Sequence, residues 1–356
     1  MVRREWDVGN AVLVVDQRLP HAAKRQLFET LGVHTIVTAD ERTHSGLVAA
    51  PMKDGDAVVI STSGTSGEPK GVVHTHDGLR AASLASSAAL CVGADAHWLA
   101  CLPLAHIGGF GVLTRAWHTG ARLTIHDGFD ATNVGASDAT HVSLVPTALT
   151  RIDPSRFIRI LLGGSRPPDS LPSNTTVTYG LSESCGGVVY DRRPIPGVSV
   201  AIADDGEILL RGPMIMSRYV NPDLASPIDN DGWLHTNDFG SITDGLLHVD
   251  GRRGEMIITG GENVWPDAVE RALVTHPSIS ECAVAGVPDV EWGQVVTAWI
   301  VVDGEEPSLE EVQDHVCVEL PRYCAPRRLI VVSSLPRTSL GKVRRRDLVE
   351  ELTSRE

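Results

Sequence analysis

The stretch DAVVISTSGTSGEPKG, residues 56–71, joins an apolar run to a loop that is crowded with glycines and hydroxyl side chains. We predict that Ala57–Ile60 is a buried strand, and the loop follows its carboxyl end, where α/β proteins place ligand sites. Glycines let backbone N–H groups approach a ligand closely, the hydroxyls add donors, and Lys70 adds a positive charge. Together these features predict a loop that grips phosphate oxygens.

The spacing of Lys70 argues against the most familiar phosphate loop. In a Walker A motif a glycine directly precedes the lysine, whereas Glu68 and Pro69 separate Gly67 from Lys70 here. A P-loop nucleotide hydrolase is therefore disfavoured. A flexible surface loop rich in glycine and serine is also disfavoured, because Pro69 and Lys70 stand at fixed places in the stretch.

Strands and helices alternate on both sides of this loop. Towards the N-terminus we predict a strand at 11–15, a helix at 20–32 that ends at Gly32, and a strand at 33–40. Apolar runs predict further strands towards the C-terminus, at residues 97–104, 121–126, 141–146, 159–164 and 176–180. This β–α–β rhythm predicts an α/β fold with a largely parallel sheet.

Beyond about Ile195 the pattern predicts a β-rich subdomain. Apolar and polar residues alternate on both sides of DDG, residues 204–206, which is the pattern of a hairpin. The same alternation surrounds DGRRGE, residues 250–255, and predicts a second hairpin.

A small separate unit is predicted after Glu255. Pro266 begins one helix, and Ser308 with Glu311 forms the capping box of another. Strand-like runs lie between these helices, at 280–287 and 295–302. Because 356 residues exceed one ordinary core, we predict a large N-terminal domain of layered sheets and helices and a small C-terminal α+β domain.

Composition and charge limit the partners. The net charge of −14 argues against nucleic acid or an anionic membrane surface as the main partner. No apolar run approaches the ~20 residues of a membrane span, and the N-terminus lacks the apolar core of a signal peptide. The six cysteines are scattered without a C-x-x-C pair, which favours free, mostly buried thiols in the cytoplasm over zinc or disulfides.

Seven motifs in order resemble those of the adenylate-forming, AMP-binding superfamily of acyl-CoA synthetases. They are TSGTSGEPKG (62–71), LPLAHIGGF (102–110), YGLSESCGG (179–187), GEILLRGPMIMSRYVN (206–221), DGWLHTNDFG (231–240), GRRGEMIITGGENVWPDAVE (251–270) and LPRTSLGKVRR (335–345). Two departures stand out, since Ser182 replaces a threonine of the family pattern and Asn237 replaces a glycine.

The resemblance implies a two-step reaction. A carboxylate attacks the α-phosphate of ATP and expels pyrophosphate, and the acyl-adenylate then reacts with a nucleophile, often the thiol of coenzyme A. Such chemistry depends on in-line placement and charge neutralisation. ATP, Mg²⁺ and coenzyme A are therefore the implied cofactor and co-substrates, alongside a small carboxylic acid. The resemblance leaves a homodimer open.

The resemblance also assigns residues to the nucleotide. Those expected to cradle the β- and γ-phosphates are Thr62, Ser63, Gly64, Thr65, Ser66, Gly67 and Lys70. Those expected to border adenine are Gly163, Gly164, Ser165, Tyr179 and Gly180. Ser182 should contact the α-phosphate, Glu183 should hold Mg²⁺, Asp238 should accept hydrogen bonds from the ribose hydroxyls, and Arg252 should contact the nucleotide.

The C-terminal motifs imply a moving domain. Lys342 is the expected catalytic lysine, whose ammonium would counter charge in the transition state. The pivot falls on Gly254, so that residues 1–253 form the AMP-binding domain, shortened at its N-terminus, and residues 255–356 the lid. In a second pose the loop with Gly260, Gly261 and Glu262 should line the coenzyme A tunnel.

The identity of the carboxylic acid is the least determined part of the predicted function. HIGG (106–109) and SESCGGVVYD (182–191) resemble o-succinylbenzoate–CoA ligases of menaquinone biosynthesis. About 60 residues precede the phosphate loop, and this short N-terminal part also resembles that of compact members of the ligase group. Residues expected around the acid are His106, Gly108, Gly109, Ser143 and Gly186. An aromatic dicarboxylate would need a cationic or hydrogen-bonding partner, for which His106, Ser143 and Arg115 are candidates by their position in the sequence. A synthetase for another short, medium-chain or aryl acid stays open.

Three further interpretations are weighed against this one. GLSES (180–184) approaches the G-x-S-x-G of serine hydrolases, but Ser184 occupies the place of the last glycine. His74 and His76 could belong to a metal-binding module, although two ligands are few. A degenerate ATP-binding protein would keep the fold without activity, yet Glu183 and Lys342 are both retained.

Overall fold

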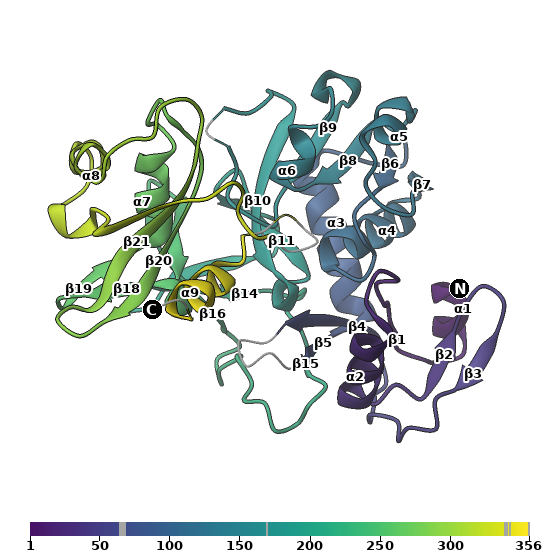
Figure 1. Cartoon of the computed structure of the whole chain (residues 1–356). Coiled ribbons are helices and arrows are strands. Elements are labelled where there is room, and N and C mark those ends of the chain that lie inside the picture. Colours follow the sequence, from purple (N-terminus) through teal and green to yellow (C-terminus); the bar gives the residue numbers. More distant parts are fainter. Residues whose placement is uncertain (64–68, 169, 338–340, 342, 355–356) are drawn as a thin grey trace. The chain divides into compact units, whose positions relative to one another are not determined.

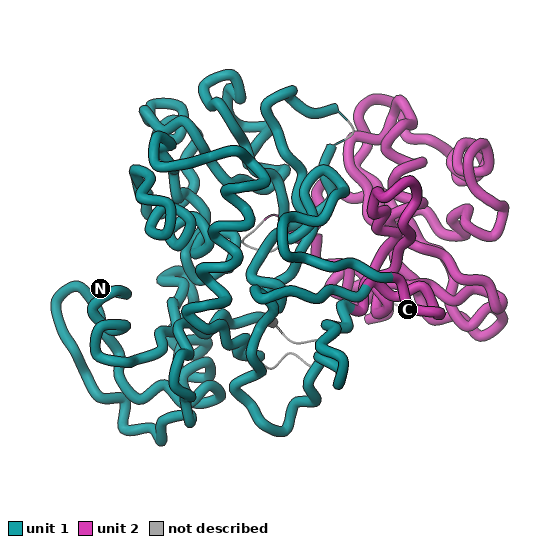
Figure 2. The backbone as a smooth tube through the Cα atoms, turned by 180° about the vertical axis from the view of Figure 1, so that it is seen from behind, with its two compact units in different colours: residues 1–201, 209–236 teal, residues 202–208, 237–356 magenta. Residues whose placement is uncertain are grey.

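The computed structural model describes residues 1–63, 69–168, 170–337, 341 and 343–354 (Figure 1). The chain forms two compact units (Figure 2). The first contains residues 1–201 and 209–236, and the second contains residues 202–208 and 237–356. Helices and sheets occur in both units, and the expected α/β organisation with a larger N-terminal part is confirmed.

A seven-stranded sheet forms the centre of the first unit, in the order β12-β11-β10-β9-β8-β6-β7. Its strands are β6 His97–Ala100, β7 Arg122–Ile125, β8 His141–Leu144, β9 Arg159–Leu162, β10 Thr175–Leu181, β11 Gly186–Tyr190 and β12 Arg193–Pro194. The five strands predicted from apolar runs all form, and they pair in parallel. β6 and β8 are buried along their whole length, as expected for parallel strands with helices on their faces.

Helices supply the cover for this sheet. The two longest, α3 His76–Leu90 and α4 Ile107–Thr119, pack against each other and against β11 (Figure 1). Shorter ones are α5 Ala131–Ala136, α6 Pro146–Leu149 and the 3-10 turns η1 Pro154–Arg156 and η2 Ser182–Ser184. The turn η2 follows the carboxyl end of β10 and therefore stands at the ligand-binding edge of the sheet.

The quoted stretch belongs to a second sheet, in the order β1-β4-β5-β15. Its strands are β1 Val12–Leu13, β4 Asp56–Ser63, β5 Pro69–Thr75 and β15 Arg218–Tyr219. The strand expected at Ala57–Ile60 continues to Ser63 and pairs antiparallel with β5. The phosphate loop therefore connects the two strands of a hairpin. Valines at positions 58, 59, 72 and 73 stabilise this pairing because all four are buried.

Further N-terminal elements precede this hairpin, and α2 packs on it. They are α1 Val2–Asp7, α2 His21–Leu31, β2 Thr35–Val37 and β3 Arg42–His44. Leu27 and Leu31 of α2 form a core with Val59 and Val73. The helix ends as predicted at Gly32, whose φ of 60° lies in the left-handed region that glycine adopts without strain.

The β-rich part contains a sheet in the order β13-β14-β16-β17. Its strands are β13 Ser199–Ile202, β14 Glu207–Arg211, β16 Leu234–Thr243 and β17 Leu246–Arg252. The hairpin predicted at 204–206 forms. The hairpin predicted at 250–255 is wrong, because β17 pairs with β16, and the turn η3 Arg253–Glu255 then leads to a strand of another sheet.

The C-terminal part has a sheet in the order β19-β18-β21-β20, with β22 beside β21. Its elements are β18 Ile257–Thr259, β19 Glu262–Val264, α7 Pro266–Leu273, β20 Ile279–Asp289, β21 Gly293–Val302, α8 Leu309–Cys317, η4 Arg322–Cys324, β22 Arg328–Val331 and α9 Arg345–Thr353. The predicted proline start of α7 and the Ser308–Glu311 capping box of α8 are both confirmed. Gly254, the predicted pivot, lies within η3 of the second unit, so the boundary between residues 253 and 255 stays a prediction.

None of the helices in the described part of the chain is long and apolar enough to cross a membrane. All six cysteines are free, and Cys101, Cys185 and Cys324 are buried. Burial raises the pKa of both Cys101 and Cys185 to about 12, so these thiols stay protonated at neutral pH.

Candidate active site

Strand β5 presents a row of predicted site residues on one face. Side chains alternate between the two faces of a strand, so Lys70, Val72 and His74 share a face. Thr62 of β4 stands directly opposite Lys70 in the antiparallel register and therefore points to the same side. The hairpin thus brings together Thr62 and Lys70, which flank the phosphate loop.

The turn η2 lies over this face and carries Ser182 and Glu183. Nε2 of His74 lies 2.7 Å from the carbonyl oxygen of Ser182. Burial lowers the pKa of His74 to about 4, so the ring is neutral at pH 7, and Nε2 carries the proton because a carbonyl only accepts. Cys185 closes the turn with a φ of 60°.

The contact between His74 and Ser182 bears on the hydrolase alternative. A catalytic histidine must bind the hydroxyl of its serine. His74 instead donates to the backbone carbonyl of Ser182, and its Nδ1 has no hydrogen-bond partner in the described structure. The geometry therefore supports a structural bond beneath the turn and gives no support to a hydrolase triad.

Glu183 is the expected ligand for Mg²⁺, and its surroundings fit that role. Oε1 accepts a hydrogen bond of 3.0 Å from the hydroxyl of Tyr219, and the backbone carbonyl of Glu183 accepts one of 2.8 Å from Met216. Mg²⁺ is commonly held by one or two carboxylates together with substrate phosphates. Within the described residues no group of three His, Cys, Asp or Glu side chains could hold a metal ion, so a module built on His74 and His76 has no support.

The expected adenine border depends on close backbone packing. Gly163 follows β9, and a Cβ there would collide with the Thr178 hydroxyl. Gly180 follows Tyr179 in β10, and a Cβ on it would overlap the carbonyl oxygen of Gly186. Glycine is therefore required at Gly180, where the close neighbour is backbone, and Tyr179 is half-buried. Gly164 and Ser165 directly follow Gly163 in the loop after β9.

The residues expected around the acid gather near the start of α4. His106 caps this helix, and Gly108 and Gly109 lie in its first turn. A Cβ on Gly186 would stand 3.7 Å from Ile107, so β11 and the helix start are neighbours. Burial lowers the pKa of His106, although Asp16 acts in the opposite direction. Ser143 is buried on β8, a strand that α4 contacts.

Arg115 is buried behind this group, on the same helix, with 8% of its surface exposed. Its Nε donates to the Ser86 hydroxyl at 2.9 Å, and its guanidinium lies 4.5 Å from the centroid of the Trp98 ring. Tyr190 also hydrogen-bonds to it, and burial lowers its pKa. Its Nη1 has no partner within the described part of the chain, and no carboxylate faces it there.

The second unit holds the residues expected at the ribose. Asp238 of β16 stands directly opposite Arg252 of β17, with 3.4 Å between Oδ1 and Nε. Asn237, which replaces the family's glycine, has a φ of 58°. Asparagine tolerates this left-handed conformation better than most residues. The backbone therefore keeps the shape that glycine would give, and Asp238 keeps its place.

The loop expected at coenzyme A is a tight hairpin. β18 and β19 pair antiparallel, and Thr259 opposite Glu262 closes a two-residue turn. Gly260 and Gly261 form this turn with φ values of 59° and 87°, as two-residue hairpins require.

Five predicted site residues and one side chain lie outside what the structure describes. They are Gly64, Thr65, Ser66, Gly67 and Lys342, together with the side chain of Ser63. Their roles stay predictions.

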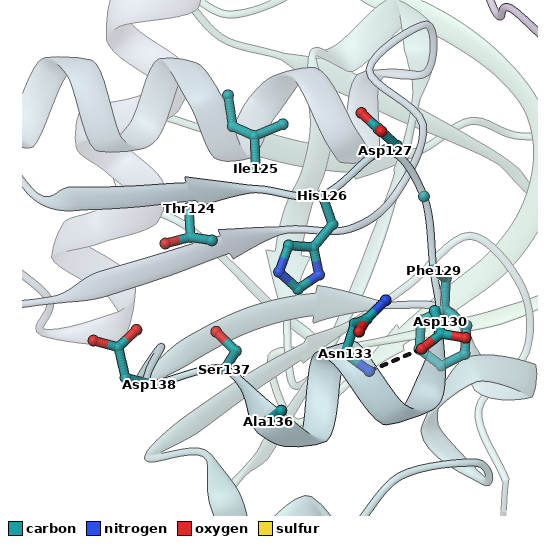
Figure 3. A pocket seen from close by; sticks show the side chains of 11 residues that line it. Thr124, Ile125, His126, Asp127, Phe129, Asp130, Asn133, Ala136, Ser137 and Asp138 are labelled. Carbon is teal, nitrogen blue, oxygen red and sulfur yellow. Dashed lines mark hydrogen bonds between the residues drawn. The ribbon is translucent and has the colours of Figure 1, made fainter.

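The first unit also has a surface hollow. It is formed by the end of β7, the loop after it and α5, and its lining includes His126, Asp130 and Asp138 (Figure 3). None of the predicted site residues lines it, and we assign it no function.

Comparison with known families identifies the class. Residues 7–220 match the family model described as AMP-binding enzyme, and residues 268–342 match that of the AMP-binding enzyme C-terminal domain. The chain therefore belongs to the AMP-binding enzymes, and the resemblance drawn from its seven motifs is confirmed. It is an adenylate-forming enzyme whose nucleotide is ATP.

The curated relatives share one name, whereas the similar solved structures also include an amide bond synthetase of Marinactinospora thermotolerans. A probable 2-succinylbenzoate–CoA ligase of Mycobacterium tuberculosis (strain H37Rv) is 38% identical over 85% of this chain and 86% of its own. The 2-succinylbenzoate–CoA ligase of Bacillus anthracis (strain A0248) is 34% identical over 83% and 70%. The o-succinylbenzoate CoA synthetase of Bacillus subtilis, solved with its acyl-adenylate intermediate, has a TM-score of 0.77 and 27% identity over 98% of this chain and 80% of its own.

Proposed function

We propose that the protein is a 2-succinylbenzoate–CoA ligase of menaquinone biosynthesis. It would join the acid to AMP with release of pyrophosphate and then transfer the acyl group to coenzyme A with release of AMP. The named relatives support this substrate, and the surroundings of Arg115 support it independently.

Arg115 carries the argument for a dicarboxylate. A buried guanidinium is strongly disfavoured unless an anion or a full set of hydrogen bonds compensates it. Arg115 has hydroxyl partners in Ser86 and Tyr190 and an aromatic ring in Trp98, but its Nη1 is unpaired in the described structure. The second carboxylate of 2-succinylbenzoate would supply the missing acceptor. A monocarboxylate would leave the charge uncompensated and would therefore be rejected.

The other residues would act on the nucleotide. Thr62 and Lys70 would hold the outgoing phosphates, Ser182 would contact the α-phosphate, and Asp238 would accept from the ribose hydroxyls. Glu183 would hold Mg²⁺, which neutralises phosphate charge when bound. Lys342 would place its ammonium between the attacking carboxylate and the α-phosphate.

The second half-reaction would need the predicted rotation about Gly254. That rotation would bring the Gly260–Gly261 turn and Glu262 to the pantetheine of coenzyme A. A reducing cytoplasm suits the six free cysteines. A homodimer stays an open expectation.

The test is ATP–pyrophosphate exchange with a panel of acids. We expect exchange with 2-succinylbenzoate and little with benzoate or octanoate. Arg115→Met should raise KM for 2-succinylbenzoate by at least tenfold, and Arg115→Lys should recover only part of this, because lysine lacks the planar fork. Exchange with octanoate in the absence of exchange with 2-succinylbenzoate would refute the proposed substrate and favour the alternative of another acid.

A further inference from the structure

Strand β15 directs two neighbouring residues to opposite faces of its sheet. It pairs antiparallel with β5, so that Arg218 stands opposite Val73 and Tyr219 opposite Val72. Arg218 forms an ion pair with Asp56 on one face. Tyr219 therefore lies on the other face, the one that carries Lys70, His74 and the turn η2.

On that face Tyr219 contacts two predicted site residues from distant parts of the chain. Its hydroxyl donates to Oε1 of Glu183 at 3.0 Å. Its ring centroid lies 5.5 Å from Nζ of Lys70, within the range of a cation–π interaction. Lys70 is two residues from Val72, the direct partner of Tyr219, and such diagonal neighbours are within reach of long side chains.

We propose that Tyr219 is a positioning residue that sets Glu183 and Lys70 relative to each other in the ATP site. This proposal rests on the proposed function only in taking Glu183 and Lys70 as nucleotide-binding residues. The hydroxyl occupies one carboxylate oxygen and fixes the glutamate side chain, which leaves the other oxygen for the metal. The ring holds the ammonium on the same side, where the phosphates are expected.

The chemistry of Mg²⁺ explains why such a residue is needed. The ion demands near-octahedral geometry, so a carboxylate that rotates freely binds it poorly. A phenol is neutral at pH 7 and donates one hydrogen bond without competing for the metal. A positively charged side chain in place of Tyr219 would instead repel both the metal and Lys70.

Two substitutions distinguish the contribution of the Tyr219 hydroxyl from that of its ring. Tyr219→Phe removes the bond to Glu183 and keeps the ring near Lys70, whereas Tyr219→Leu removes both. Binding is measured without acid or coenzyme A, by electron paramagnetic resonance of Mn²⁺ with ATP and by calorimetry of ATP in the presence of EDTA. Thermal unfolding of each variant without ligand serves as the control for folding.

Tyr219→Phe should weaken binding of Mn²⁺–ATP by about tenfold to a hundredfold, the range for hydrogen bonds to charged groups, and leave metal-free ATP within about twofold. Tyr219→Leu should also weaken metal-free ATP. In a Glu183→Gln background, Tyr219→Phe should have little further effect, because it acts through that carboxylate.

Wild-type affinity of Tyr219→Phe for Mn²⁺–ATP would overturn the proposal. Equal losses with and without metal, or a full further loss in the Glu183→Gln background, would overturn it as well. Because no acid is present, these outcomes are independent of whether 2-succinylbenzoate is the substrate.

Discussion

The ion pair between Asp56 and Arg218 ties the start of β4 to β15, and its loss should destabilise the first unit. The Asp56 side chain is 2% exposed, and both of its oxygens accept from the guanidinium, at 2.9 and 2.7 Å. Oδ2 also accepts from the Lys53 amide at 2.7 Å. Arg218→Met keeps much of the side-chain volume and leaves a buried carboxylate with a single backbone donor.

The magnitude follows from this geometry. Removing one partner of a buried pair costs about 3–5 kcal/mol, because the other charge is left uncompensated. The Lys53 amide and the 21% exposure of the Arg218 side chain favour the lower end, about 3 kcal/mol. For a domain of about 150–250 residues this corresponds to a fall in Tm of about 6–12 °C.

The pKa of Asp56 determines how the loss of stability changes with pH. Burial acts to raise the pKa of Asp56, but the bonds from Arg218 and Lys53 hold it below its ordinary value. A lowered carboxylate pKa contributes stability above the unfolded pKa of about 3.9 and loses it as the pH falls through the folded value. Without Arg218, burial should raise the pKa of Asp56 in the variant, so its carboxyl takes up a proton before that of the wild type. The difference in Tm between the wild type and Arg218→Met should therefore be full at pH 7 and shrink as the pH falls towards and below about 4.

Differential scanning calorimetry at pH 7 and at pH 3.5 measures this. The control is the double variant Asp56→Asn with Arg218→Met, in which no charge is buried, and it should recover a large part of the lost stability at pH 7. A Tm for Arg218→Met within about 2 °C of wild type at pH 7 would refute the reasoning, as would a difference that does not change with pH.

Three further predictions concern the backbone and the thiols. Asn237→Val should lower stability by about 1–2 kcal/mol, because a β-branched residue is strained at a φ of 58°, and Asn237→Gly should be tolerated; urea unfolding distinguishes them. Gly180→Ala should abolish most ATP–pyrophosphate exchange and also lower Tm, since its methyl group would meet the carbonyl of Gly186 and displace the strand; an unchanged rate would contradict this packing. Alkylation of the native protein at pH 8, followed by peptide mass mapping, should label the exposed Cys91 and spare Cys185, whose pKa is about 12; early labelling of Cys185 would show that the site is open.

Local patterns predicted those elements whose stability depends on nearby residues. The capping box at Ser308, the proline start of α7 and the left-handed Gly32 each act within a single turn of helix. The apolar runs of β6 and β8 predicted buried strands because full burial leaves no polar face.

Local patterns did not determine which strands pair. The phosphate loop follows Ala57–Ile60 as predicted, but only the structure shows that β4 pairs with β5 across it. The segment 250–255 looks like a hairpin turn, yet the strands on its two sides belong to different sheets. Alternation identifies a strand, whereas its partner depends on which other strand can cover its edge.

For the site, the sequence alone determined the family, the order of its motifs and the type of residue at each position, because a phosphate or a metal demands particular side chains. It also raised His106, Ser143 and Arg115 as candidate partners of an aromatic dicarboxylate, without a choice among them. Only the tertiary structure decided that Arg115 is buried with Nη1 unpaired and that Tyr219 joins Lys70 to Glu183. Burial and side-chain contacts depend on residues far apart in the chain, so the spacing within one motif cannot predict these contacts.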